Sequence, residues 1–147
     1  MVSLLDVNVL VALAWPNHVH HRAAHRWFAR HAGAGWATSS IVEVGFVRVC
    51  SNARVIPSAV APQEAAALLR RVTALPGHHF WADNVRFAES PHVALARVVG
   101  HQQVTDAHLI GLAVRHRGCL VTFDRRLRSL VPAGHEPDAV VVVPAAD

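Results

Sequence analysis

The sequence predicts a three-layer α/β/α domain in which a short parallel sheet lies between two layers of helices. Short, continuous apolar segments, typical of strands buried on both faces, alternate with segments of helical character. The chain of 147 residues has the usual size of one domain, and 52% apolar against 16% charged residues is typical of globular proteins. No repeat, linker or low-complexity segment divides it, so we expect one domain over residues 1–147.

The first part of the chain alternates strands and helices, and its breaks are set by proline and glycine. Pro16 ends the first helix, and Gly33 follows the second. Ser40 and Glu43 have the spacing of a capping box, which predicts a third helix starting at Ser40. The predicted elements are a strand at 2–5, helices at 7–15 and 20–31, a strand at 36–38 and a helix at 40–50.

The second part shows the same alternation. Pro62 and acidic Glu64 indicate the start of a helix. Thr105 is a suitable N-cap for a helix that Gly118 ends. The predicted elements are helices at 62–75, 91–100 and 106–117, a short helix at 125–130, and strands at 79–81, 119–123 and 139–143.

Four acidic residues lie where apolar runs meet the edges of predicted elements. Asp6 and Asp124 each follow a strand, whereas Glu43 and Asp106 lie in the first turns of helices. An unpaired buried charge is costly, so carboxylates within apolar segments need a partner. Ligands of open α/β sheets bind outside the carboxyl ends of the strands, and the helices that follow strands begin at that edge. We therefore expect all four acids to converge on one site.

Clustered carboxylates repel one another, and a divalent cation relieves that repulsion. A set of oxygen ligands favours Mg²⁺ or Mn²⁺ over Zn²⁺. Asn8 and Thr122 each lie two residues from one of the acids and are expected to orient the carboxylates or a metal-bound water. The sequence therefore predicts a magnesium or manganese enzyme.

The chain is basic, with a formal net charge of +4 and an isoelectric point near 10.9. The sequence contains 14 Arg and no Lys. The absence of Lys excludes mechanisms that need a Lys nucleophile or a P-loop Lys. A basic surface around an acidic centre suits a phosphodiester polymer. Arg125, Arg126 and Arg128 directly follow Asp124 and are candidate contacts to the backbone of such a polymer; a solvated helix face is the alternative interpretation.

Taken in order, these motifs resemble the PIN-domain ribonucleases, and in particular the VapC toxins of bacterial toxin–antitoxin pairs. The resemblance spans nearly the whole chain and rests on residues 4–10 (LLDVNVL), Glu43, residues 104–107 (VTDA) and residues 120–124 (LVTFD). It implies a Mg²⁺- or Mn²⁺-dependent endoribonuclease whose acidic site is Asp6, Glu43, Asp106 and Asp124. It also implies a homodimer inhibited by a cognate antitoxin protein, with DNA bound only through that antitoxin.

Two other chemistries of strand-end aspartates fit less well. A dehalogenase-type phosphatase needs a second Asp two residues after the first, where this chain has Asn8, and a receiver domain needs a Lys. The competing interpretation of another class is a non-catalytic module that binds the antitoxin and serves as a co-repressor. Its amphipathic helices 7–15 and 62–75 would form a groove for a partner helix.

The remaining features indicate no further chemistry. The N-terminus lacks the basic region of a signal peptide and no stretch is long enough to span a bilayer, so we expect a cytoplasmic protein. Cys50 and Cys119 lie in apolar runs and are interpreted as buried thiols. The His-rich segment 18–25 lacks the Cys or third ligand of a zinc site. His108 and His116 are expected to be exposed rather than catalytic.

Overall fold

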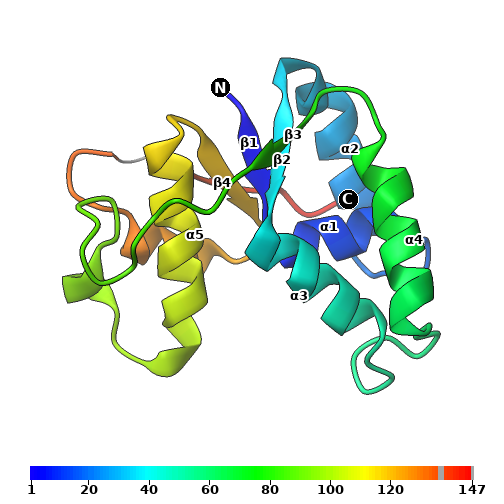
Figure 1. The fold of residues 1–147 in the computed structure, drawn as a ribbon. Helices are drawn as coiled ribbons and strands as arrows, with labels where there is room; N and C mark the ends of the chain where they lie inside the picture. Colours follow the sequence, from blue (N-terminus) through cyan, green and yellow to red (C-terminus); the bar gives the residue numbers. More distant parts are fainter. Residues whose placement is uncertain (136–137, 147) are drawn as a thin grey trace.

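The protein forms a five-stranded, fully parallel sheet covered by helices, as the computed structural model shows (Figure 1). The structure describes residues 1–135 and 138–146. The strands are arranged in the order β3-β2-β1-β4-β5. They are β1 (Ser3–Leu5), β2 (Trp36–Ser39), β3 (His78–Trp81), β4 (Cys119–Thr122) and β5 (Val140–Val142). The predicted fold class is confirmed.

The helices lie in two layers whose membership follows from the strand order. The chain moves in one direction from β1 through β2 to β3, and then crosses back to β4 and β5. Parallel crossovers are right-handed, so the two halves place their helices on opposite faces of the sheet. Figure 1 shows α5 on one side and α1, α2 and α4 on the other. The helices are α1 (Val7–Ala14), α2 (His21–His31), α3 (Ser40–Cys50), α4 (Pro62–Thr73) and α5 (Val104–Arg115).

Four short 3₁₀ helices among the described residues connect these elements: η1 (Ala32–Ala34), η2 (Leu95–Arg97), η3 (His101–Gln103) and η4 (Arg125–Leu130). The direction of chain progression reverses between β1 and β4, which are neighbours in the sheet. This is the topological switch point, where an open α/β sheet leaves a crevice at the carboxyl ends of its strands. The fold therefore places the residues that follow β1 and β4 beside one another.

The helix predicted at 91–100 is wrong. The segment contains turns and the single 3₁₀ turn η2, because it has no continuous apolar face: Val93 is buried, while Leu95 and Val99 are exposed. Its backbone is held by short-range hydrogen bonds, such as the one from the Arg97 amide to the Ala94 carbonyl (2.9 Å). Such local bonds do not build the regular ladder of an α-helix.

Two predicted caps are also wrong. Ser39, rather than Ser40, is the N-cap of α3, and its hydroxyl accepts a hydrogen bond from the Val42 amide (3.5 Å). Thr105 lies inside α5, which begins one residue earlier because η3 leads directly into it without a side-chain cap. Residues 125–130 form a 3₁₀ helix, η4, a tighter form than the α-helix favoured by the sequence pattern.

The core contains the sheet and the inner faces of both helical layers. Trp36 and Phe46 are its largest fully buried side chains. Cys50 and Cys119 are buried and free, as the sequence predicts. Within the described residues, none of the helices combines the length and apolar character needed to cross a bilayer.

Gly118 is a position where packing leaves no room for a side chain. A Cβ there would lie 2.4 Å from the Val2 carbonyl oxygen and 2.6 Å from the Trp81 ring, whereas at Gly33 nothing lies within 4 Å. Overpacking of this kind costs about 1–3 kcal/mol. We expect Gly118→Ala to lower the free energy of unfolding by that amount in urea denaturation, with Gly33→Ala as the matched control near wild type. Equal stability of the two variants would contradict this packing.

Candidate functional site

Asp6 directly follows β1 and has both carboxylate oxygens bonded. Its Oδ1 accepts a hydrogen bond from the Val7 amide (2.8 Å), which caps α1, and its Oδ2 accepts one from the Thr122 hydroxyl (2.7 Å). The side chain is buried, and this desolvation raises the pKa of Asp6 above its ordinary value, although the two hydrogen bonds oppose the shift. Asp6 is therefore a rigid carboxylate whose negative charge is only partly compensated.

Thr122, the last residue of β4, connects the polar groups of the site. While donating to Asp6, its oxygen accepts hydrogen bonds from the Asn8 side-chain amide (3.2 Å) and the Asp124 backbone amide (3.1 Å). Asn8 in turn accepts a hydrogen bond from the Phe123 amide (3.4 Å). The two supporting residues proposed from the sequence thus join the segments after β1 and β4 and hold their carboxylates in place.

Asp106 lies in the first turn of α5 and faces the two strand-end aspartates. Asp6, Asp106 and Asp124 all line one groove of about 410 Å³. The pKa of Asp106 rises from 3.8 to about 6, chiefly because the residue is half-buried and also because of the negative charges of Asp6 and Asp124. The fold brings together three of the four predicted acids, and their mutual repulsion is evident in this pKa.

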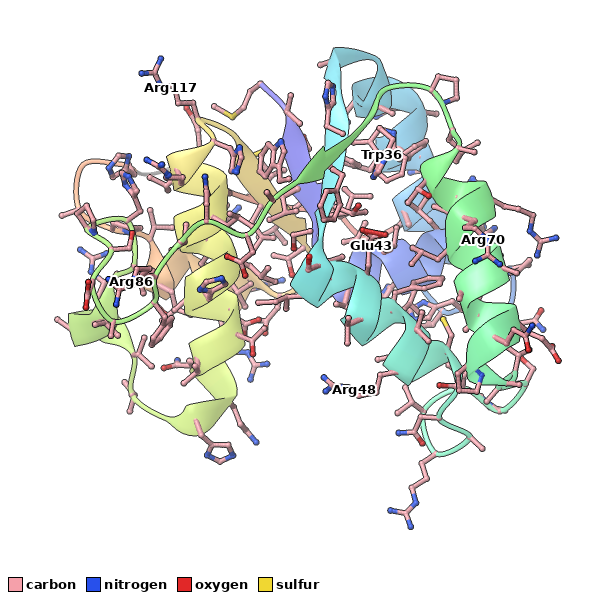
Figure 2. All side chains as sticks on the ribbon, viewed as in Figure 1. Trp36, Glu43, Arg48, Arg70, Arg86 and Arg117 are labelled. Carbon is pink, nitrogen blue, oxygen red and sulfur yellow. The ribbon has the colours of Figure 1, made fainter. Side chains whose placement is uncertain are left out.

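Glu43 lies in the first turn of α3. Its carboxylate accepts a long hydrogen bond from the Thr38 hydroxyl (3.4 Å), and Thr38 is also bonded to His78 (2.8 Å). Glu43 does not line the groove described above, and Figure 2 shows it on the α4 side of the sheet, away from α5. Burial raises the pKa of Glu43, and the bond from Thr38 opposes this shift.

Three oxygen-bearing acids that face one groove fit a hard divalent cation, which prefers carboxylate oxygens. Among the residues that the structure describes, no three His, Cys, Asp or Glu side chains are already arranged around a single metal position. Burial is the main cause of the raised pKa of Asp106, and the negative charges of Asp6 and Asp124 add to it; a positive charge in the groove would offset that second contribution.

The three candidate arginines of η4 differ in their surroundings. The Arg126 guanidinium bonds both oxygens of Asp124, with Nε at 2.9 and 3.2 Å and Nη2 at 2.8 Å. This contact holds the pKa of Asp124 below its ordinary value. Arg125 and Arg128 are exposed. The side chains of Arg125 and Arg128 can therefore contact a ligand at the surface, whereas Arg126 is paired with Asp124.

His108 and His116 are not exposed as predicted. His108 is buried, and its Nε2 lies 3.0 Å from both oxygens of Asp83, while half-buried His116 stacks on Trp81. The cause is that α5 is buried nearly all round, from Ala107 to Val114. The continuous apolar run of that helix signals this burial, and Asp83, two residues after β3, repeats the strand-end pattern of the other acids.

The His-rich segment has a structural role. His21 Nδ1 lies 2.8 Å from the Ala12 carbonyl and His25 Nε2 lies 3.1 Å from the Leu13 carbonyl, so both rings contact the last turn of α1. These carbonyls have no partner within their own helix, and imidazole N–H groups satisfy them.

The raised pKa of Asp106 predicts how the stability of the metal-free protein depends on pH. The folded state binds the proton more tightly than the unfolded state, so stability falls as pH rises from about 4 to about 6 and stays reduced above that range. We expect Asp106→Asn to raise the free energy of unfolding above pH 6 and to leave it unchanged near pH 4. The expected gain is on the order of 1 kcal/mol, because solvent screening at a half-buried group reduces the full value.

Thermal and urea unfolding in EDTA, from pH 4 to pH 8, measure this effect. Asp138→Asn, which removes an exposed carboxylate elsewhere, should follow the wild-type curve. A stability difference for Asp106→Asn that is the same at every pH would show that Asp106 titrates normally.

Comparison with known proteins places this chain in a family. The family model described as "PIN domain" matches residues 3–131. Ribonuclease VapC39 of Mycobacterium tuberculosis is 49% identical over 134 residues, which cover 91% of this chain and 96% of that protein. Two solved structures share the fold: M. tuberculosis VapC20, described as a sarcin-ricin loop cleaving toxin, and VapBC2 of Rickettsia felis bound to a DNA fragment from its promoter.

The VapC20 structure has a TM-score of 0.62 at 15% identity and covers 86% of this chain and 93% of its own. The VapBC2 structure has a TM-score of 0.61 at 15% identity, with coverages of 90% and 97%. At 15% identity, these two similarities show that the fold is shared and nothing further.

Proposed function

The chain belongs to the PIN-domain family, within its VapC group, and from that premise we propose that it is the endoribonuclease toxin of a toxin–antitoxin pair. The observation that carries the proposal is the meeting of Asp6, Asp106 and Asp124 in one groove at the switch point of the sheet. The name of the relative, a ribonuclease, supports RNA as the substrate.

We propose that Asp6, Asp106 and Asp124 hold Mg²⁺ or Mn²⁺. The cation supplies an activated water and stabilises the charge that develops on the phosphate during hydrolysis. Thr122 and Asn8 keep the Asp6 carboxylate oriented, and no side-chain nucleophile is required. Glu43 is the proposed fourth acid, and its carboxylate accepts a hydrogen bond from Thr38.

The surroundings of the groove suit a nucleic-acid substrate. Arg125 and Arg128 are exposed on η4, directly after Asp124, and the chain carries a formal charge of +4. We propose that these arginines contact the RNA backbone, because neutralising phosphates is the main source of affinity for nucleic acids. The protein is also proposed to act in the cytoplasm as a homodimer.

An antitoxin protein is the proposed partner. The VapBC2 structure of R. felis, which shares the fold, is bound to promoter DNA. We propose that this chain contacts DNA only through its antitoxin. Exposed apolar residues Val19 and Val55 lie beside the groove and offer a surface for such a partner.

Metal removal tests the enzymatic proposal. Purified protein, prepared free of host nucleases, should cleave RNA in Mg²⁺ or Mn²⁺, lose the activity in EDTA and regain it when metal is added in excess. Sequencing the 5′ ends of the products then identifies the RNA that is cut. Equal cleavage with and without EDTA would contradict the role of the metal.

The alternative is a non-catalytic module that binds an antitoxin and acts as a co-repressor, and the exposed apolar residues beside the groove favour it. Growth arrest on expression separates the two functions. Arrest that disappears with Asp106→Asn supports the enzyme, whereas arrest that persists at the same protein level favours titration of a partner.

A further inference from the structure

Arg126 forms an ion pair with Asp124, one of the three carboxylates that are proposed to bind metal. Its guanidinium forms a bidentate pair with Asp124, in which Nε and Nη2 cover both oxygens at 2.8 to 3.2 Å. A metal ion needs at least one of these oxygens. Arg126 and a divalent cation therefore compete for Asp124.

The local geometry makes this arginine replaceable. The Arg126 side chain is 85% exposed, against 27% for Asp124, and an exposed ion pair contributes little to stability. The backbone amide of Arg126 independently bonds Asp124 Oδ1 (2.9 Å) as the cap of η4. The carboxylate thus keeps its orientation when the guanidinium leaves.

The charges of the groove favour the exchange. Arg126 brings one positive charge, whereas three aspartates line the groove. A divalent cation brings twice that charge and reaches Asp6 and Asp106 as well. Metal binding would then repel the guanidinium from the acids.

Arg126 also borders a second cavity beside the site. This cavity has a volume of about 340 Å³ and is also lined by Asp106, Asp124 and Gln103. A guanidinium is always charged and presents a planar fork of donors that matches phosphate oxygens. At that position it is well placed to bind a phosphate of the substrate.

We propose that Arg126 is a placeholder for the metal: it neutralises Asp124 in the metal-free protein, gives way to the divalent cation, and then binds an RNA phosphate. This inference rests on the proposed metal-dependent nuclease function. It couples the two binding events, because RNA affinity contributed by Arg126 appears only once metal is bound.

Isothermal titration with Mn²⁺ tests the first half. Arg126→Gln should bind Mn²⁺ up to about 5-fold more tightly than wild type, the fold-change that corresponds to the upper value for one exposed competing ion pair. Arg128→Gln removes the same charge from the same helix without touching Asp124 and should stay within about 2-fold of wild type, because exposed charges are screened. Unchanged or weaker Mn²⁺ binding by Arg126→Gln would overturn the proposal.

RNA binding tests the second half. Fluorescence anisotropy with a single-stranded RNA is measured in EDTA and in Ca²⁺, and the RNA is checked for integrity on a gel. Wild type should bind more tightly with Ca²⁺ than in EDTA, and Arg126→Gln should lose most of that gain. An equal gain in both proteins would exclude the phosphate contact.

The outcomes also separate this inference from the function on which it rests. Failure of wild type to bind Mn²⁺ would argue against the metal-dependent nuclease itself. Mn²⁺ binding of equal strength in wild type and Arg126→Gln would remove only the role of Arg126.

Discussion

Replacing Asp6 by Asn should reduce metal-dependent RNA cleavage by about 100-fold or more while the protein stays folded. Losses of this size follow when a single electrostatic contact to the transition state is removed. Asn has the shape of Asp but no charge, so it binds a divalent cation poorly. The buried Asp6 carboxylate has a raised pKa, and its neutral replacement relieves desolvation instead of adding to it.

Three measurements are needed for the Asp6 prediction. Cleavage rates are compared at saturating Mn²⁺, Mn²⁺ affinity is measured by titration, and the fold is checked by circular dichroism and urea unfolding. Asp138→Asn, an exposed substitution of the same kind, should keep wild-type rates. If the Asp6 variant cleaves RNA at the wild-type rate, the proposed mechanism is wrong.

The sequence was sufficient to predict the placement of Asp6 and Asp124, because strands that are buried on both faces are recognisable and parallel strands end at one edge of the sheet. Asp106 was predictable because it opens an apolar helix after a crossover. Each of these inferences depends on backbone topology, which hydrophobic patterning largely determines. The same patterning led to the correct fold class.

The partners of the charged side chains did not follow from patterning. Glu43 bonds Thr38, Arg126 pairs with Asp124, and His108 pairs with Asp83. Such pairs depend on rotamers and on the path of the irregular segment between β3 and α5. That segment was also where a helix was wrongly predicted, since short apolar runs are ambiguous in type. Tertiary contacts decide these features.

Replacing Thr122 by Val should weaken Mn²⁺ binding by about 10- to 100-fold, the usual cost of removing a group that orients a metal ligand. Val has nearly the shape of Thr but lacks the hydroxyl, which donates to Asp6 and accepts from Asn8 and the Asp124 amide. The Asp6 carboxylate then loses one of its two donors in a buried environment and is held by the Val7 amide alone. Its pKa should rise further, because that hydrogen bond favours the charged form.

Two variants distinguish a specific effect on the orientation of the Asp6 carboxylate from a general loss of stability. Thr122→Ser restores the hydroxyl and should recover most of the Mn²⁺ affinity, even though it leaves a small cavity at a fully buried position. Thr73→Val is the matched control, because the Thr73 hydroxyl bonds only carbonyls of α4. If Thr122→Val retained full affinity, or if Thr122→Ser were as weak as Thr122→Val, side-chain volume rather than the hydroxyl would be what matters. Recovery of affinity in Thr122→Ser but not in Thr122→Val would show that Mn²⁺ binding depends on the hydroxyl oxygen of residue 122. That oxygen links the segments that follow β1 and β4, which carry Asp6 and Asp124.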